Sequence, residues 1–298
     1  MAPTASRRIV YLGTPALAVA PLRALVGAGH DVRLVVTRPD RRRGRGAGVS
    51  ASPVKAEAEQ LGLPVAHALD AAVDVGAELG VVVAYGRVVP GWVLKRLPMV
   101  NLHFSLLPRW RGAAPVERAI LAGDQATGVC VMALEEELDT GPLYASREVE
   151  IAPGEHLGSL RGRLVEVGTR LLVDVLGGPL VEPRRQTGVP TYAAKLDPEE
   201  LRLTWSRPAA EIARVVRLDR AWTTWRGRRL LVLDAEAVAG GDEGAGAAAP
   251  GSLDGATVVT GHGSLQLLYV QPEGRAPMHA AEWLRGARPV AGERLGGS

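Results

Sequence analysis

Asn101 and His103 are the two residues of this 298-residue chain whose types and spacing first suggest a functional site. They stand two positions apart in Met99–His103, a run that predicts a β-strand, so their side chains should point to the same face. An amide on this face can donate a hydrogen bond to a ligand, and an imidazole beside it can carry a proton. A hydrogen-bonded core histidine is the commoner role of a lone His, and at this stage that alternative stays open.

Asp139 is the carboxylate that could complete such a site. It lies in an acidic segment, 135–141, that directly follows a predicted strand, and Thr140-Gly141 after it marks a tight turn that could aim the carboxylate into a site. Glu135 to Glu137 are interpreted as a solvated acidic surface. The pattern therefore separates one candidate catalytic carboxylate from three surface ones.

A loop with bulky apolar content, Phe104 to Gly112, follows the predicted strand. Leu106 and Leu107, if exposed beside a cleft, would suit a planar heterocyclic ligand. A loop that is simply packed is the alternative. Phe104 is the only phenylalanine in the sequence, so its position beside the candidate site is unusual.

Two arginine-rich segments stand out against a chain whose formal net charge is only +3. The first contains Arg38, Arg41, Arg42, Arg43 and Arg45, offset by Asp40 and interleaved with glycines. Such a segment cannot build a core and suits phosphate contacts, although a merely solvated loop would look the same.

The second basic segment covers residues 202–229 and interleaves its arginines with Trp205, Trp222 and Trp225. Arg207, Arg214 and Arg217 fall on one predicted helical stripe. Basic plus aromatic residues favour a nucleic-acid partner, with an exposed amphipathic helix as the alternative. Outside the two segments the chain is net acidic, so the small net charge conceals the polarity that binding a polyanion requires.

Several classes of protein are disfavoured by composition and motifs. Cys130 is the only cysteine, which excludes an intramolecular disulfide and a thiolate metal site and predicts a reducing compartment, the cytoplasm. No histidine spacing suggests a metal, and no apolar run approaches the ~18 to 20 residues of a membrane span. Gly13-Thr14-Pro15 interrupts the apolar N-terminal stretch that would imitate a signal peptide. The same tripeptide lacks the second glycine of a dinucleotide fingerprint.

The elements that must position these residues alternate between strand and helix. The predicted strands cover 8–12, 31–37, 81–85, 99–103 and 127–134, and the predicted helices cover 15–28, 53–62, 114–121 and 155–176. This alternation predicts a doubly wound α/β domain with a mostly parallel sheet over residues 1–182. Open sheets of this kind bind ligands at the carboxyl ends of their strands, which is where Asn101 and His103 lie.

The remainder of the chain differs in kind. Residues 183–203 are rich in Pro, Thr and charge, which suits a linker. Residues 204–298 contain short β-rich runs at 230–233, 257–260 and 265–270, separated by turns, and this predicts a small antiparallel barrel.

Taken together, these motifs closely resemble the formyltransferases that depend on 10-formyltetrahydrofolate. The motifs are Gly13-Thr-Pro15, Val82–Gly86, Asn101-Leu-His103, Ser105–Pro115 and Leu138–Gly141. Ser52-Pro-Val-Lys55, Thr191–Leu196 and the Arg109–Pro115 part of the loop resemble the methionyl-tRNA formyltransferase family in particular. The similarity runs from about residue 8 to the C-terminus and weakens after 205.

The resemblance implies a Rossmann-like formyltransferase domain followed by an OB-like tRNA-binding barrel. It implies transfer of the formyl group of 10-formyltetrahydrofolate, the co-substrate, to the amino group of methionyl initiator tRNA for translation initiation, without a metal. Asn101 and His103 would donate to the tetrahedral oxyanion, and Asp139 would orient His103 or move protons. We expect a cytoplasmic monomer. The folate site would be lined by Ser105, Leu106, Leu107 and Pro108, and the tRNA would contact Arg41, Arg42, Arg43, Arg45 and Lys195.

Three positions depart from the family pattern. Phe104 replaces a glycine, the segment between Val65 and Val81 is short, and Asp219–Thr223 replaces a proline-rich Asn-Pro-Trp-Pro. Two rivals remain: a folate formyltransferase acting on a ribonucleotide or a nucleotide sugar, and a catalytically dead RNA-binding protein with the same fold. The residues after 203, about the size of a small domain, argue against the first. The intact Asn, His and Asp argue against the second.

Overall fold

The computed structural model describes residues 6–42, 49–238, 248–290 and 292–297. The chain forms two compact units. The first unit comprises Met1–Val116, Ala126–Glu150 and Arg161–Ala194, and the second comprises Glu117–Gln125, Ile151–Leu160 and Lys195–Ser298. The predicted division into 1–182, 183–203 and 204–298 stays a prediction, and the second unit includes two segments from the first 182 residues.

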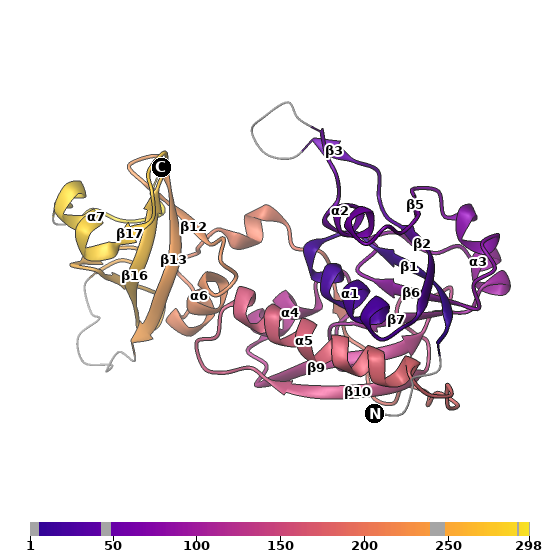
Figure 1. Ribbon diagram of the computed structural model, residues 1–298. Helices are drawn as coiled ribbons and strands as arrows, with labels where there is room; N and C mark the ends of the chain where they lie inside the picture. Colours follow the sequence, from indigo (N-terminus) through magenta and orange to yellow (C-terminus); the bar gives the residue numbers. More distant parts are fainter. Residues whose placement is uncertain (1–5, 43–48, 239–247, 291, 298) are drawn as a thin grey trace. The chain divides into compact units, whose positions relative to one another are not determined.

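A seven-stranded, mostly parallel sheet forms the centre of the first unit (Figure 1). Its order is β10-β9-β7-β6-β1-β2-β5. The bounds are β1 (Arg8–Gly13), β2 (Asp31–Val36), β5 (Val65–Ala66), β6 (Leu79–Val83), β7 (Met99–His103), β9 (Ala126–Ala133) and β10 (Leu143–Glu150). Strands β5, β2, β1, β6 and β7 run parallel, while β9 is antiparallel to β7 and β10 is antiparallel to β9. This confirms the predicted mostly parallel α/β sheet.

The helices and short elements of the first part of the chain follow the predicted order. They are η1 (Ala16–Ala18), α1 (Val19–Gly27), α2 (Pro53–Gln60), η2 (Asp70–Val73), α3 (Gly91–Arg96), α4 (Pro115–Ala122) and α5 (Leu157–Leu176), with the short strands β3 (Arg41–Arg42), β4 (Val49–Ser50), β8 (Arg111–Gly112) and β11 (Tyr192–Ala193). The helix predicted from Pro15 begins later, because Pro15 has an extended ψ and a short 3-10 turn precedes α1.

The two faces of β7 have different neighbours. Leu102 lies under α5, where a Cβ on Gly168 would come within 3.1 Å of the Leu102 side chain. Met99, on the opposite face, belongs to an apolar cluster with Val93 of α3. Because side chains alternate along a strand, Asn101 and His103 share the face of Met99. The sheet is thus covered on both sides, as a parallel sheet requires.

The second unit is built on an antiparallel sheet in the order β12-β13-β16-β15-β14, with β17 paired to β16. The bounds are η3 (Pro198–Leu201), α6 (Ala209–Val216), β12 (Trp222–Trp225), β13 (Arg228–Val238), β14 (Leu253–Asp254), β15 (Thr257–Val259), β16 (Ser264–Pro272), β17 (Met278–His279) and α7 (Ala280–Ala287). The predicted antiparallel sheet is therefore confirmed. Its three predicted strand runs fall in β13, β15 and β16, whereas α7 was not predicted.

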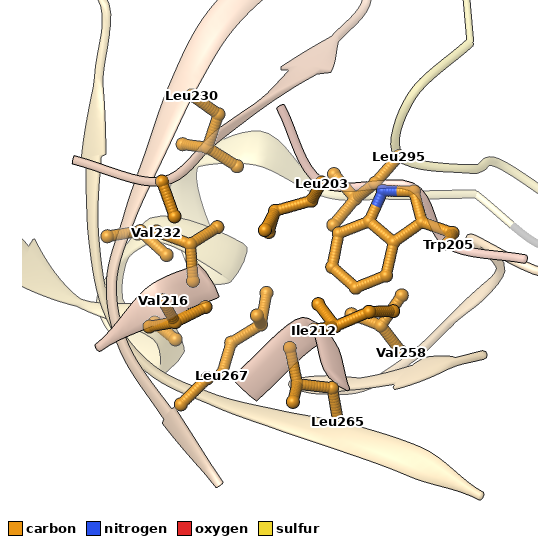
Figure 2. Close-up of a cluster of buried hydrophobic side chains, with 14 of the residues drawn as sticks. Leu203, Trp205, Ile212, Val216, Leu230, Val232, Val258, Leu265, Leu267 and Leu295 are labelled. Carbon is orange, nitrogen blue, oxygen red and sulfur yellow. The ribbon is translucent and has the colours of Figure 1, made fainter. Parts of the chain in front are cut away.

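One apolar core organises the second unit (Figure 2). Side chains such as Ile212, Leu230 and Val258 converge on it from α6, β13 and β15. Trp205 belongs to the same core: its ring is buried, and its indole N–H donates to Thr223 Oγ1 at 3.0 Å. This tryptophan cannot stack on a nucleic acid, so its inclusion among the predicted RNA-contacting aromatics was wrong.

Candidate active site

The structure brings His103 and Asp139 together. Nδ1 of His103 lies 3.6 Å from Oδ2 of Asp139, and both side chains are almost completely buried. Asn101 lies one pleat earlier on the same face of β7 and is also buried. Three polar side chains from two distant segments therefore share a largely water-excluded region.

The imidazole of His103 has a defined orientation. Its Nε2 lies 3.0 Å from the carbonyl oxygen of Trp110. A carbonyl only accepts hydrogen bonds, so Nε2 carries a hydrogen and Nδ1 is the nitrogen that faces Asp139. The 3.6 Å separation is longer than a hydrogen bond, and catalytic contacts of this kind often shorten only when substrate is bound. A second hydrogen on Nδ1 would place a cation beside the buried carboxylate.

The Asp139 turn is held in a conformation that few residues adopt. Asp139 has φ of 52°, in the left-handed region, and its Oδ2 accepts a hydrogen bond from the Gly112 N–H at 2.7 Å. A Cβ at Gly141 would lie 1.9 Å from the carbonyl oxygen of Ala133, so only glycine fits there. Because the turn is fixed on both sides, the Asp139 carboxylate is aimed inward, while Glu135 to Glu137 are exposed as expected.

Gln186 is the functional residue that the sequence did not reveal. Its Nε2 donates to the carbonyl oxygens of Asp139 and Gly141, each at 2.8 Å. Its Oε1 accepts from the Arg111 guanidinium, at 3.2 Å from Nε and 2.6 Å from Nη2. One side chain thus ties the Asp139 turn to the strand that carries Gly112. Its segment had been predicted only as a linker, and a single glutamine there gives no periodic signal.

Residues 191–193 contact the loop that follows β7 and hold it in place. The Trp110 N–H donates to Thr191 Oγ1 at 2.9 Å, and β8 pairs in parallel with β11. A Cβ at Gly112, where φ is 122°, would lie 2.8 Å from the carbonyl oxygen of Ala193. The Thr191–Ala193 part of the sequence motif therefore positions the loop whose Trp110 and Gly112 contact His103 and Asp139.

The four candidate folate residues have different surroundings. Ser105 is fully buried and donates to the carbonyl oxygen of Arg109 at 2.6 Å, so its hydroxyl is used within the loop. Leu107 packs against Cys130 and Met132, and the expectation that it is exposed was wrong. Leu106 and Pro108 are half-buried and keep exposed surface. Apolar β9 draws Leu107 inward, because burying such a side chain removes apolar area from water.

Cys130 has no place in the chemistry. Burial raises the pKa of its thiol to about 11, although a hydrogen bond with the backbone of Leu107 opposes that shift. A thiol with so little thiolate at neutral pH is a poor nucleophile. Its contacts with Leu107 and Met132 make it part of the support for the loop.

The residues that flank the arginine-rich segment are held by a short strand pair and by an ion pair. Arg41 and Arg42 form β3, which pairs with β4, whereas Arg43 and Arg45 lie outside the described residues. The Lys55 Nζ donates to Asp40 Oδ2 at 2.6 Å, and this bond raises the pKa of Lys55. The Ser52 side chain caps α2 by accepting from the Lys55 N–H.

The arginines of the predicted stripe on α6 mostly bond to acceptors within the second unit. Arg214 donates to the carbonyl oxygen of Leu121 at 3.2 Å, and Arg217 donates to that of Glu155 at 2.8 Å. Burial lowers the pKa of Arg217. Arg207 pairs with Glu211, at 3.5 Å. The interpretation of this stripe as an RNA-facing surface is therefore wrong for Arg214 and Arg217, while Lys195 is exposed as a tRNA contact would need.

Within the described ranges, no cluster of three or more His, Cys, Asp or Glu side chains is arranged to hold a metal ion. Among the helices of the same ranges, none combines the length and the apolar character that crossing a membrane would take.

Comparison with known proteins places this geometry in context. Residues 7–176 match the formyl transferase family, and residues 195–288 match the formyl transferase C-terminal domain family. The chain is 46% identical over 296 residues to the methionyl-tRNA formyltransferase of Dinoroseobacter shibae, covering 94% of this chain and 97% of the relative. It is 41% identical over 322 residues to that of Acidothermus cellulolyticus, covering 97% and 99%.

Solved structures share the fold at low sequence identity. HypX from Aquifex aeolicus in complex with tetrahydrofolic acid has a TM-score of 0.62 and 18% identity, over 96% of this chain and 48% of that one, so this chain spans about half of the larger protein. The N-formyltransferase from Helicobacter canadensis, in complex with folinic acid and dTDP-3-aminofucose, has a TM-score of 0.67 and 14% identity, over 88% and 99%. Likeness at these identities extends to the fold alone.

Proposed function

The chain belongs to the methionyl-tRNA formyltransferase family, and we propose that it transfers the formyl group of 10-formyltetrahydrofolate to the amino group of methionyl initiator tRNA. The observation that carries this proposal is the buried grouping of Asn101, His103 and Asp139, held by Trp110 and Gly112. The identity of 46% and 41% to two methionyl-tRNA formyltransferases over nearly the whole chain supports it over a ribonucleotide or nucleotide-sugar acceptor. The retained Asn101, His103 and Asp139 support it over a catalytically dead protein.

The protein must perform three functions in this reaction. The amine lone pair attacks the formyl carbon, and the carbonyl electrons move onto oxygen to give a tetrahedral oxyanion. Collapse of that oxyanion breaks the carbon bond to N10 of the folate, and the proton lost by the amine ends on N10. One C–N bond forms and one breaks, with no change of oxidation state. The protein must therefore position the reactants, stabilise an oxyanion and carry one proton.

Asn101 is suited to stabilise the oxyanion. Its side-chain amide has no hydrogen-bond partner among the described residues, and the residue is only 9% exposed. The amide is not among the fully buried polar atoms that lack a partner, so it keeps a small exposed surface that an incoming oxygen can reach, and strand β7 fixes the face on which it lies. Such a preorganised donor is worth most where water is excluded, because no reorganisation is needed as charge develops.

His103 is suited to donate a second hydrogen bond to the oxyanion, and Asp139 is suited to accept the proton of the amine. With Nε2 held by Trp110, the Nδ1 edge of His103 faces the reacting region together with Asp139 Oδ2. In the proposal a protonated Nδ1 donates to the oxyanion, and Asp139 orients the ring and accepts the proton released by the amine. Passing that proton on to N10 restores the resting arrangement. This uses the pair as a relay of the kind general acid–base catalysis requires.

Substrate contacts complete the proposal. Leu106 and Pro108 offer half-buried apolar surface to the folate, while Ser105 and Leu107 hold their loop in place. The tRNA contacts proposed from the arginine-rich segment and beyond are Arg41, Arg42, Arg43, Arg45 and Lys195, which act through phosphate neutralisation. The enzyme works in this proposal as a cytoplasmic monomer and without a metal.

One assay tests the function. Purified protein is incubated with 10-formyltetrahydrofolate and methionyl initiator tRNA, and formylated methionyl-tRNA is separated from the unformylated form after acid quenching. We expect formylation that depends on both substrates and is almost abolished in Asn101→Ala. A ribonucleotide amine and an amino sugar nucleotide serve as alternative acceptors. Formylation of either of these, with none of the tRNA, would overturn the proposal.

A further inference from the structure

Trp110 has a backbone conformation that few bulky residues adopt. Its φ is 62°, in the left-handed region, where a side chain crowds its own backbone. Its carbonyl oxygen is also the acceptor that Nε2 of His103 faces at 3.0 Å. A strained residue persists only where its surroundings hold the backbone on both sides of it. The orientation of the His103 ring therefore depends on the groups that fix the backbone of Trp110.

Thr191 holds both of the peptide planes that flank Trp110. The Trp110 N–H donates to Thr191 Oγ1 at 2.9 Å, and the Arg111 N–H donates to the Thr191 carbonyl oxygen, also at 2.9 Å. The C=O and N–H of a trans peptide point in opposite directions. Because the Arg111 N–H faces Thr191, the Trp110 carbonyl of the same peptide points away from Thr191. His103 lies on that side.

The contacts of Thr191 differ in what a substitution can remove. A residue of any type at this position supplies the carbonyl oxygen for Arg111, and also the N–H that donates to the Pro108 carbonyl oxygen at 3.2 Å. The acceptor for the Trp110 N–H, in contrast, is the side-chain hydroxyl. A point mutation can therefore remove this one contact and leave the two backbone contacts in place.

Two acceptors compete for the single ring hydrogen of a neutral His103. The Trp110 carbonyl oxygen lies 3.0 Å from Nε2, and Asp139 Oδ2 lies 3.6 Å from Nδ1. The stronger of the two hydrogen bonds decides which nitrogen carries the hydrogen. If the carbonyl turned away, the carboxylate would draw the hydrogen to Nδ1. The Asp139 oxygen proposed to take the amine proton would then already be bonded to the ring.

We propose that Thr191 is a positioning residue: its hydroxyl fixes the Trp110 carbonyl, and that carbonyl keeps the His103 hydrogen on Nε2 with the Nδ1 edge toward the reacting region. The inference rests on the proposed function for the rate that Thr191 controls, whereas the position of the ring hydrogen can be measured without any substrate. It gives a chemical role to a threonine 81 positions away from Trp110, in a segment that the sequence predicted as a linker.

Two variants separate this role from a packing role. Thr191→Val keeps the size of the side chain and removes the hydroxyl, whereas Thr191→Ser keeps the hydroxyl. Steady-state formylation is measured with each substrate varied in turn. We expect Thr191→Val to lower kcat roughly tenfold, which is less than the ~100-fold that a displacement of about 1 Å can cost, with both KM values unchanged. Thr191→Ser should stay within about twofold of the wild-type kcat.

Thr260→Val is the matched control. It also removes a buried threonine hydroxyl, which donates to the carbonyl oxygens of His262 and Gly263 in the second unit, each at 2.8 Å. We expect this variant to keep the wild-type kcat. The unfolding temperature of every variant is measured, and Thr191→Ala, which also lacks the hydroxyl, replaces Thr191→Val if valine prevents folding.

The ring hydrogen is located separately by nitrogen-15 NMR of substrate-free protein with labelled histidine at pH 8, where an ordinary imidazole is neutral. His103→Asn identifies the His103 signals by their loss. The wild type and Thr191→Ser should carry the hydrogen on Nε2, and Thr191→Val should shift part of the population to Nδ1.

The inference requires both a lowered kcat and a changed ring signal in Thr191→Val. A wild-type kcat in that variant, a lowered kcat with an unchanged ring signal, or an equal loss of kcat in Thr191→Ser would each overturn it. Absence of formylated product with the wild-type protein would instead remove the proposed function. The NMR comparison would then still decide whether Thr191 fixes the ring.

Discussion

The candidate active site and the exposed arginines of the second unit use polar side chains in opposite ways. In the first unit, Asp139, His103 and Gln186 are each held by backbone groups at 2.7 to 3.0 Å. In the second unit, Arg202 and Arg229 are exposed, and their guanidinium groups lie over the Trp222 ring at 5.4 and 4.5 Å from its centroid. Stabilising a transition state requires groups fixed before the reaction, whereas attracting a polyanion requires charge that water can still reach.

Arginine itself illustrates the difference. Arg111 and Arg217 are bonded to Gln186 and to the Glu155 carbonyl, so they act as structural donors. Arg229 belongs to the same residue type but lies exposed in β13, with its guanidinium 4.5 Å from the centroid of the Trp222 ring. The function of an arginine in this protein is therefore determined by whether an acceptor lies within reach. We expect variants of the candidate active site to lower kcat and variants of the basic surfaces to raise the KM for tRNA.

The largest effect is expected for Asp139→Asn. The substitution preserves shape and the bond from the Gly112 N–H but removes the proton acceptor. Loss of general acid–base assistance typically costs a factor of ~10² to 10⁴, so kcat should fall within that range while tRNA binding is unchanged. Single-turnover formylation measures the rate, and Glu136→Gln, an exposed carboxylate of the same loop, serves as the control. A rate close to wild type would assign Asp139 a purely structural role.

A smaller effect is expected for Gln186→Leu. The carbonyl oxygens of Asp139 and Gly141 and the Arg111 guanidinium would lose their partner, and leaving such groups unsatisfied costs about 1 to 3 kcal/mol. We expect a kcat lowered roughly tenfold, corresponding to about 1.4 kcal/mol, with the KM for tRNA unchanged. Gln186→Glu retains the acceptor for Arg111 but not the donor for the turn. If Gln186→Glu matched the wild-type kcat, the donor would not position Asp139.

Neutralising the arginine-rich segment should change the affinity for tRNA rather than the rate of the chemical step. Arg41→Ala, Arg42→Ala and Arg43→Ala together should raise the KM for tRNA several-fold and leave the KM for 10-formyltetrahydrofolate unchanged, because phosphate contacts supply affinity but no chemistry. Steady-state kinetics with each substrate varied in turn provide the measurement. Equal kinetics in the triple variant and the wild type would exclude this segment from tRNA binding.

The smallest effect concerns stability in acid. The hydrogen bond from Arg23 lowers the pKa of Glu57, which joins α1 to α2. A carboxyl group with a lowered folded-state pKa stabilises the protein above its unfolded pKa of about 4.3, and this contribution is lost as the pH falls further. Urea unfolding between pH 7 and pH 3 should therefore show a steeper loss of stability for the wild type than for Glu57→Gln. Parallel curves would contradict this linkage.

Much of the site was predictable because its signals are local. The strand Met99–His103 has the predicted bounds, and its alternation alone places Asn101 and His103 on one face. The turn at Asp139 was indicated by the Thr-Gly that follows it. Such features depend on neighbours in sequence, so the residue types are sufficient to predict them.

The remainder depends on contacts between distant segments. Gln186 contacts residues 45, 47 and 75 positions away, and nothing in its own segment indicates them. Arg217 finds its acceptor 62 positions away. Strand β10 was missed because it lies at the sheet edge and is mostly exposed, so its residues show little apolar alternation. A helical or strand periodicity predicts neither an exposed edge strand nor a hydrogen bond to an acceptor far away in the sequence.

The most direct test of the division between the two regions is single-turnover formylation at saturating methionyl-tRNA and 10-formyltetrahydrofolate. Asn101→Ala removes an oxyanion donor, which typically costs about 2.7 to 4 kcal/mol of barrier, so the rate should fall roughly 10² to 10³-fold. The variant with Arg41→Ala, Arg42→Ala and Arg43→Ala together should react at the wild-type rate once the tRNA is saturating. A near-normal rate for Asn101→Ala, or a collapsed rate for the arginine variant, would contradict the assignment of chemistry to the candidate active site and of RNA binding to the basic surfaces.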